Sequence, residues 1–300
     1  MRLDEFLRAN TSKDVSRIVM AIADSSVRVW EAIPGNAALL SAVNPSGEKQ
    51  KAIDVFSNDL FTKALVATRE VREVASEEMP EPVRGGGEIS VAMDPLDGSS
   101  NIGTNNPVGS IFGFYSSRLP APGRSLIGAL FVTYGSMTTI TLSLGVDVHR
   151  FVAVRHGSRF EFEMLDSGLR FPIEPEVYGF GGFRKDWIEP VQDFVSTLED
   201  RGLKLRYCGT FVGDYNQVLA RGGIFAYPAL KEKPKGKLRV LYETAPMAYI
   251  TKQAGGYATD GARSILEIVP DSLADTSPAY LGSYSLTAEI EELISRGRLS

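Results

Sequence analysis

Between residues 71 and 154 the chain carries six short apolar runs in succession, and this block restricts the fold more than any other part of the sequence. Turn residues such as Gly135 and Gly145 separate the later runs, which is typical of neighbouring strands in one sheet. A sheet of this size needs other elements to cover its faces. The expected strands are Val71–Ala75, Ile89–Met93, Val108–Tyr115, Leu126–Tyr134, Met137–Leu144 and Val148–Val154.

Helical patterns lie on both sides of this block. Thr11 or Ser12 is placed to cap a helix that ends near Ile33, because Pro34 stops it, and residues 53–67 carry a second apolar helical face. Helices and strands alternate beyond residue 175. The helices expected there are Trp187–Glu199, Gly213–Ala220, Leu241–Ala254 and Thr287–Ser295, and the strands are Leu203–Cys208 and Ile224–Tyr227.

Helix, sheet, helix, sheet, helix is the simplest layering that covers both faces of two sheets. The sequence therefore predicts an α/β (α+β) fold built as a layered αβαβα sandwich. We expect two α/β halves, residues 1–170 and residues 171–300, of which the first carries the acidic motifs described below.

The composition narrows the choice of partner and compartment. A net charge of −5 argues against nucleic acid, whose binding needs clustered Lys and Arg. The single cysteine, Cys208, excludes an internal disulfide and a Cys-rich zinc site, so a reducing cytoplasm is expected. The first residues lack the apolar core of a signal peptide, and no run of about 18 apolar residues indicates a membrane span.

Two of the expected strands end in acidic residues. The run Ile89–Met93 leads directly into Asp-Pro-Leu-Asp-Gly-Ser-Ser-Asn at 94–101, and Val71–Ala75 is followed by Ser76 and Glu77-Glu78. Carboxylate and carbonyl oxygens are the ligands that Mg²⁺ prefers. The sequence therefore predicts a Mg²⁺ site at these strand ends.

The octapeptide also predicts a site for an anion. Pro95 fixes φ and turns the chain, so that Asp94 and Asp97 face one point and the Leu96 carbonyl is freed from the strand ladder. Gly98 permits close backbone approach. Ser99-Ser100-Asn101 would open a helix whose N–H groups and dipole favour phosphate.

Carboxylates for a metal beside amides for an anion suit one ligand class, a phosphate ester held by metals. Hydrolysis of a phosphate monoester needs an acceleration of up to about 10²¹-fold, of which a general base supplies only about 10²–10⁴. Most of the barrier must fall through electrostatic stabilisation, which paired Mg²⁺ ions about 3.5–4 Å apart provide. The chain is therefore predicted to be a metal-dependent phosphatase.

Seven motifs follow one another along the chain from about residue 45 to the C-terminus. In addition to the octapeptide 94–101 and Ser76-Glu-Glu, they are Ser57-Asn-Asp-Leu60, Ser110-Ile-Phe-Gly113, Gly223-Ile-Phe-Ala-Tyr-Pro228, Gly236-Lys-Leu-Arg-Val-Leu-Tyr-Glu243 and Gln253-Ala-Gly-Gly256. Together, and in matching order, they resemble class I fructose-1,6-bisphosphatase. Inositol monophosphatases share the metal chemistry but usually carry a Thr-Thr version of the turn.

The resemblance implies Mg²⁺ dependence, with two or three ions per subunit and Mn²⁺ as a substitute, and a homotetramer. It implies that Glu78 and Asp54 activate the attacking water, in a catalytic group with Glu77 and Asp97. It assigns the metal ligands to Glu77, Glu78, Asp94, the Leu96 carbonyl, Asp97 and Glu243, with Glu48 and Asp54 on a mobile acidic loop.

The same resemblance implies a substrate site for a sugar bisphosphate. Asp97, Gly98, Ser99 and Ser100 would hold the 1-phosphate. The distal phosphate and the sugar would be gripped by Arg206, Tyr207, Tyr227 and Lys237, with Arg206 reaching in from a neighbouring subunit as one option. The implied activity is hydrolysis of fructose 1,6-bisphosphate, in gluconeogenesis or carbon fixation.

Two departures from the family pattern leave alternatives open. Phe180 and Phe183 stand where the family has an Asn and a Tyr on the 6-phosphate, so Arg184 or Lys185 would rebuild that grip. Asp214-Tyr-Asn-Gln217 resembles sedoheptulose-1,7-bisphosphatase, which keeps that enzyme or a dual-specificity one as an alternative. A non-catalytic phosphate-binding module is the remote alternative.

A further departure concerns regulation. Family members that AMP inhibits carry a Lys-Tyr pair before the catalytic strand and an Arg after the Ile-Phe-Gly strand. This chain has Glu88-Ile89 and Ser116 at those positions. Because the Glu88 carboxylate would repel the AMP phosphate, we expect no inhibition by AMP at that site.

Overall fold

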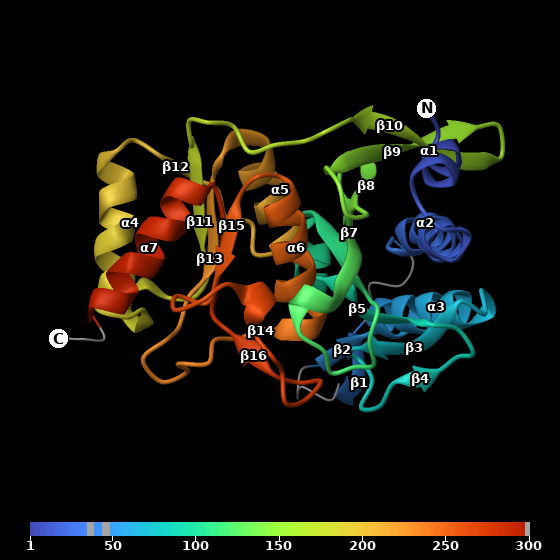
Figure 1. The fold of residues 1–300 in the computed structure, drawn as a ribbon, viewed down its shortest axis with the longest axis horizontal. Helices are drawn as coiled ribbons and strands as arrows, with labels where there is room; N and C mark the ends of the chain where they lie inside the picture. Colours follow the sequence, from blue (N-terminus) through green and yellow to red (C-terminus); the bar gives the residue numbers. More distant parts are fainter. Residues whose placement is uncertain (35–38, 44–48, 298–300) are drawn as a thin grey trace.

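The computed structural model describes residues 1–34, 39–43 and 49–297, and within them it has seven α-helices and seventeen strands (Figure 1). The helices are α1 (Leu3–Asn10), α2 (Lys13–Ala32), α3 (Ala52–Ala67), α4 (Glu189–Asp200), α5 (Phe211–Arg221), α6 (Ala245–Gln253) and α7 (Tyr284–Gly297). Short 3₁₀ segments are η1 (Ser99–Thr104), η2 (Gly123–Ser125), η3 (Arg184–Asp186) and η5 (Ile265–Glu267), and η4 (Val240–Thr244) is a π-helical turn.

The strands form two large sheets and two small antiparallel pairs. The eight-stranded sheet has the order β10 (Arg159–Asp166), β9 (His149–His156), β8 (Thr138–Ser143), β7 (Leu126–Tyr134), β6 (Val108–Tyr115), β5 (Ile89–Asp97), β3 (Val71–Ser76) and β4 (Val83–Arg84). The five-stranded sheet has the order β12 (Lys204–Leu205), β11 (Val177–Phe180), β13 (Gly223–Tyr227), β17 (Ala279–Gly282) and β15 (Tyr257–Thr259). The small pairs are β1 (Leu39–Val43) with β2 (Lys49–Lys51), and β14 (Leu238–Arg239) with β16 (Thr276–Ser277).

Three apolar cores hold five layers together, in the order helices, sheet, helices, sheet, helices (Figure 1). Helices α1, α2 and α3 pack on the outer face of the eight-stranded sheet, where the rings of Phe61 and Phe112 meet edge to face at 4.9 Å. Helices α5 and α6 fill the space between the sheets, and Phe211 stacks on Phe225 at 4.6 Å. Helices α4 and α7 cover the outer face of the five-stranded sheet. The predicted αβαβα sandwich is confirmed.

Most predicted elements of the first half are present with small shifts. Ser12 is the N-cap of α2, because its hydroxyl accepts a hydrogen bond from the Val15 amide at 3.3 Å. The six predicted strands appear as β3 and β5 to β9. The strand predicted to end at Met93 continues to Asp97, and all nine residues of β5 are buried. The division at residue 170 stays a prediction.

Three predictions for local structure differ from the structure. The strand expected over Leu203–Cys208 pairs only at β12, since the amides of Cys208 and Gly209 turn away to the Asp214 carboxylate. The helix expected from Leu241 begins as the π-helical turn η4. The helix expected to open at Ser99 is only the six-residue η1. Helix α1 and strands β1, β2, β4, β10, β11 and β14 to β17 were not predicted.

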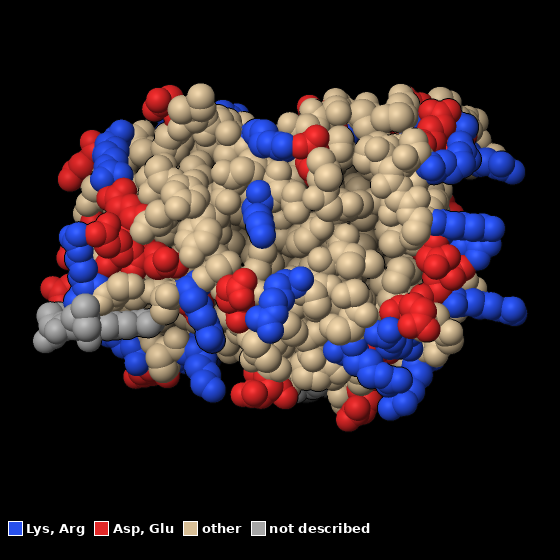
Figure 2. Space-filling model, in the orientation of Figure 1, with Lys and Arg blue, Asp and Glu red and all other residues tan. Residues whose placement is uncertain are grey.

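Charges of both signs are interspersed on the face shown in Figure 2, mostly towards the two ends of the molecule. Among the helices that the structure describes, none combines the length and the apolar character that crossing a lipid bilayer requires.

Candidate active site

Two parallel strands place the acidic motifs side by side. Strands β3 and β5 run parallel with Ser76 opposite Met93, and the Glu77 amide donates to the Met93 carbonyl at 3.2 Å. Because the carboxyl ends of parallel strands lie at the same edge of a sheet, Glu77 and Glu78 meet Asp94 there. The adjacency follows directly from the strand pairing.

A bulge in β5 turns both aspartates to one side. Asp94 pairs with Ile111 and Asp97 with Gly109, so three steps along β5 oppose two along β6. In a regular strand residues three apart point to opposite faces, and the extra residue brings the two aspartates to the same face. The Asp94 carboxylate accepts the Leu96 amide at 2.9 Å and stabilises the bulge.

The C-terminal half adds Glu243 and Arg239 to this edge. One carboxylate oxygen from each of Asp94, Asp97 and Glu243 lies within 4.8 Å of the others. The Arg239 guanidinium donates to Glu77 at 2.7 Å, and the Arg239 amide donates to Glu243 at 2.6 Å. A largely buried arginine thus joins two acids that are far apart in the sequence.

Burial makes this cluster unfavourable when all its carboxylates are charged. Burial, followed by the charge of Glu243, raises the pKa of Glu77, while Arg239 opposes the shift. Burial and Glu77 raise the pKa of Asp94. Burial raises the pKa of Asp97 to about 7, although the Val212 amide stabilises its charged form. Hard carboxylate oxygens that repel one another at this range fit Mg²⁺ or Mn²⁺, which would remove the repulsion.

The turn after Asp97 lies beside the acids in the same cavity. Gly98 has φ +73°, and a Cβ built there would lie 2.0 Å from the Thr210 side chain, so position 98 requires glycine. The short η1 follows at Ser99, and Ser99 and Ser100 face the same cavity as the acids.

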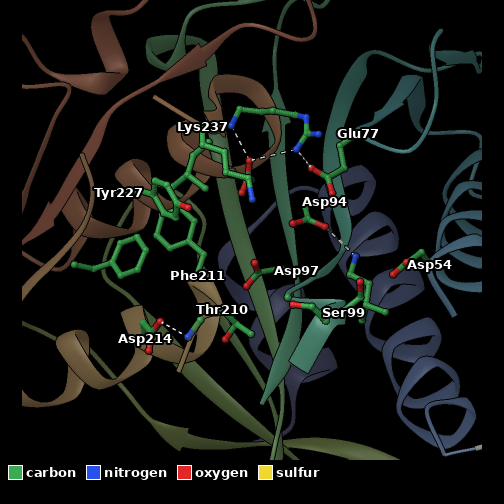
Figure 3. Close-up of a pocket in the computed structure, with 18 of the residues that line it drawn as sticks. Asp54, Glu77, Asp94, Asp97, Ser99, Thr210, Phe211, Asp214, Tyr227 and Lys237 are labelled. Carbon is green, nitrogen blue, oxygen red and sulfur yellow. Dashed lines mark hydrogen bonds and ion pairs between the residues drawn. The ribbon is translucent and has the colours of Figure 1, made fainter. Parts of the chain in front are cut away.

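One cavity of about 250 Å³ contains nearly all of the predicted site residues. In Figure 3 the side chains of Glu77, Asp94 and Asp97 lie around its centre, with Tyr227 and Lys237 on one side and Asp54 on the other. The predicted residues in its wall are Asp54, Glu77, Glu78, Asp94, Leu96, Asp97, Gly98, Ser99, Ser100, Tyr207, Tyr227, Lys237 and Glu243.

A few predicted residues lie elsewhere. Glu48 is outside the described residues. Arg206 is exposed and donates to its own neighbour, the Leu205 carbonyl, at 2.9 Å. Phe180 packs against Trp187 in the outer core, and the Phe183 side chain is exposed, so neither stands in the cavity wall among the described residues. Arg184 donates to Ser196 on α4 at 2.6 Å.

The cavity wall also contains residues that sequence reasoning missed. Arg239 lies in a matched motif, and its spacing of four from Glu243 was a usable signal. Thr210 and Phe211 gave none, because their place depends on how α5 docks on the turn at Gly98. Asp214 was noted only for sugar preference, yet it lines the cavity and is buried.

Comparison with known proteins agrees with this geometry. Family models described as the N-terminal and C-terminal domains of fructose-1,6-bisphosphatase match residues 9–162 and 171–295. The chain is 39% identical over 277 residues to a class 1 fructose-1,6-bisphosphatase of Haloarcula marismortui, covering 92% of this chain and 94% of that protein. It is 41% identical over 280 residues to one from Pelobacter propionicus, covering 91% and 86%.

A solved structure shows the same architecture. Fructose-1,6-bisphosphatase of Leishmania major in its holo form superposes with a TM-score of 0.92 at 28% identity, over 99% of each chain. Taken with the acids and the amide turn gathered in one cavity, these matches show that the chain belongs to the class 1 fructose-1,6-bisphosphatase family.

Proposed function

We propose that this enzyme hydrolyses the 1-phosphate of fructose 1,6-bisphosphate to give fructose 6-phosphate and phosphate, with Mg²⁺ as cofactor. The observation that carries the proposal is the convergence of Glu77, Asp94, Asp97 and Glu243 on the cavity that also contains the Gly98–Ser100 turn. The substrate follows from the names of the relatives reported above, which are fructose-1,6-bisphosphatases.

The acids would hold two or three Mg²⁺ ions, or Mn²⁺ in their place. Glu77, Glu78, Asp94, Asp97, Glu243 and the Leu96 carbonyl supply oxygen ligands, with Asp54 approaching from α3. Bound ions supply charge stabilisation to the phosphate and the leaving oxygen. Glu48 is assigned to the same set by resemblance alone.

The chain itself binds and orients the substrate. The amides and hydroxyls of Gly98, Ser99 and Ser100 hold the scissile phosphate, and Glu78 with Asp54 takes the proton from the attacking water. Tyr207, Tyr227 and Lys237 enter the opposite side of the cavity and suit the sugar and the distal phosphate. In a cytoplasmic homotetramer, Arg206 would reach this site from a neighbouring subunit.

A second candidate function, hydrolysis of sedoheptulose 1,7-bisphosphate, differs only in the length of the sugar. Sedoheptulose 1,7-bisphosphate carries the same scissile group, so the chemistry alone admits both sugars, but the relatives' names do not favour it. Phosphate release from each sugar and from inositol 1-phosphate, with and without Mg²⁺, tests the proposal. Turnover of neither sugar bisphosphate would refute it. A non-catalytic phosphate-binding module predicts that result.

Removal of divalent cations is expected to abolish turnover and to lower stability. Without a cation the buried carboxylates repel one another, so Mg²⁺ or Mn²⁺ that binds only the folded chain should raise the unfolding temperature with concentration. Differential scanning fluorimetry after EDTA treatment, titrated with Mg²⁺, Mn²⁺ or K⁺ at constant ionic strength, checks this. An equal shift with K⁺ would indicate a general salt effect instead.

AMP is expected not to inhibit at the site that the family resemblance suggests. The Glu88 carboxylate is exposed and pairs with Arg72 at 2.9 Å, and Arg72 also donates to the Ser116 carbonyl at 3.3 Å. Arg72 is thus already engaged, and Glu88 repels a phosphate. Initial rates at rising AMP and several Mg²⁺ concentrations check this, and inhibition that competes with Mg²⁺ rather than substrate would contradict it.

A further inference from the structure

Residues 207–212 dock directly on the turn 97–101, across one end of the cavity. The Asn101 side-chain amide donates to the Cys208 carbonyl at 2.6 Å. The Val212 amide donates to the Asp97 carboxylate at 2.8 Å. Between these two bonds Gly98 touches Thr210 so closely that a Cβ would not fit. Three successive contacts therefore fix the two segments relative to each other.

Asp214 holds the same segment from the other side. Its carboxylate is buried in the first turn of α5 and accepts the Cys208 amide at 2.6 Å and the Gly209 amide at 3.0 Å. Gly209 has φ +88°, which lets the chain turn sharply before Thr210 caps α5. The peptide at Cys208 is thus bonded through its carbonyl to Asn101 and through its amide to Asp214.

The position of Tyr207 depends on this arrangement. Tyr207 lines the cavity and directly precedes Cys208, whose amide and carbonyl are both hydrogen-bonded. Asn101 is not among the described residues of the cavity wall. A shift of the Cys208 peptide would move Tyr207 away from, or towards, the Gly98–Ser100 turn. The bonds of Asn101 and Asp214 to Cys208 are two of the contacts that hold the ends of the proposed substrate site at their present separation.

We propose that Asn101 and Asp214 are positioning residues that set the length of sugar bisphosphate the enzyme accepts. The inference rests on the proposed function. The Asn101–Cys208 and Asp214–Cys208 bonds hold Tyr207 where it meets the sugar and distal phosphate of a substrate whose 1-phosphate sits on the Gly98–Ser100 turn. Breaking either bond weakens binding of the distal end of the substrate more than it slows hydrolysis at the scissile end.

The test compares substrates that share the scissile end. Fructose 1,6-bisphosphate, sedoheptulose 1,7-bisphosphate and fructose 1-phosphate, which lacks the distal group, are assayed with wild type, Asn101→Ala and Asp214→Asn. In both variants kcat/KM for fructose 1,6-bisphosphate should fall about tenfold more than kcat/KM for fructose 1-phosphate. The ratio of kcat/KM between the two bisphosphates should also move closer to one. Asn106→Ala is the matched control, because this exposed amide donates locally, to the Thr104 hydroxyl at 3.1 Å.

The outcomes test this inference separately from the proposed function on which it rests. A wild-type protein that hydrolyses none of these esters would overturn both. A wild-type enzyme that is active, with variants that lose all substrates by the same factor, would overturn the inference alone and leave a structural role. Unfolding temperatures are measured in parallel, and if Asp214→Asn does not fold, Asn101→Ala decides the question.

Discussion

The variant Asp94→Asn is expected to lose turnover of fructose 1,6-bisphosphate by about 10³-fold or more while it keeps its fold. Asp94 has 2% of its surface exposed, and its carboxylate accepts the Leu96 amide at 2.9 Å. The side-chain oxygen of Asn accepts the same bond, so the β5 bulge should survive. What the substitution removes is one negative charge at the centre of the proposed metal site.

Stability should change in the opposite sense from activity. Burial, then the charge of Glu77, raises the pKa of Asp94, so the ionised carboxylate is unfavourable when no cation is bound. Neutral Asn relieves this repulsion, and the metal-free variant should unfold at the same temperature as wild type or higher. The rise in unfolding temperature on adding Mg²⁺ should be much smaller than in wild type.

The measurement is kcat by phosphate release, together with thermal unfolding with EDTA and with Mg²⁺. Asp59→Asn is the matched control, because Asp59 is exposed on α3 and pairs only with Lys63 at 3.4 Å among the ion pairs described. A surface pair of this kind contributes little. Near-normal turnover of Asp94→Asn, or an unchanged Mg²⁺ response, would remove Asp94 from the metal site.

Local patterns were enough to predict the acidic half of the site. The apolar runs before Glu77 and Asp94 predict strands, and each run ends where its acids begin. The parallel pairing of β3 with β5 then brings the two motifs together without further information. The bulge at Pro95 and Leu96 was foreseen in its effect, since a proline there cannot continue the ladder.

The rest of the site depends on contacts between elements that are far apart in the sequence. Nothing in the sequence around Thr210 shows that α5 begins against Gly98, and the bond from Asn101 to Cys208 spans 107 residues. Strands β11 and β17 have only four residues each, too few to show a period. Strand β10 is a different case, because Arg-Phe-Glu-Phe-Glu at 159–163 alternates clearly and could have been predicted.

Arg239 shows that the charge pattern of a segment does not reveal which of its residues enter the site. Its neighbours Lys231, Lys233 and Lys235 are exposed to solvent. Arg239 instead lies at the start of the buried η4, with 16% of its side chain exposed, against Glu77 and Glu243. The structure therefore supplies a permanent positive charge to an acidic cluster before any cation binds.

The variant Arg239→Met is accordingly expected to lose about 3 kcal/mol of folding free energy in EDTA and much less in saturating Mg²⁺. Methionine keeps the length and apolar stem of the side chain, and the backbone amide still donates to Glu243. Without the guanidinium, the largely buried carboxylates of Glu77 and Glu243 lose its compensating charge. A bound cation supplies that charge, so Mg²⁺ should stabilise the variant more than it stabilises wild type.

Urea unfolding of wild type, Arg239→Met and Arg239→Lys, each in EDTA and in Mg²⁺, measures this difference. Arg239→Lys keeps the charge but loses the planar geometry of the contact with Glu77, so its loss in EDTA should lie between the other two. An equal loss for Arg239→Met with and without Mg²⁺ would mean that Arg239 acts by packing alone. The guanidinium and the cation would then not be alternative partners of the same acids, and the proposed metal site would have to exclude Glu77.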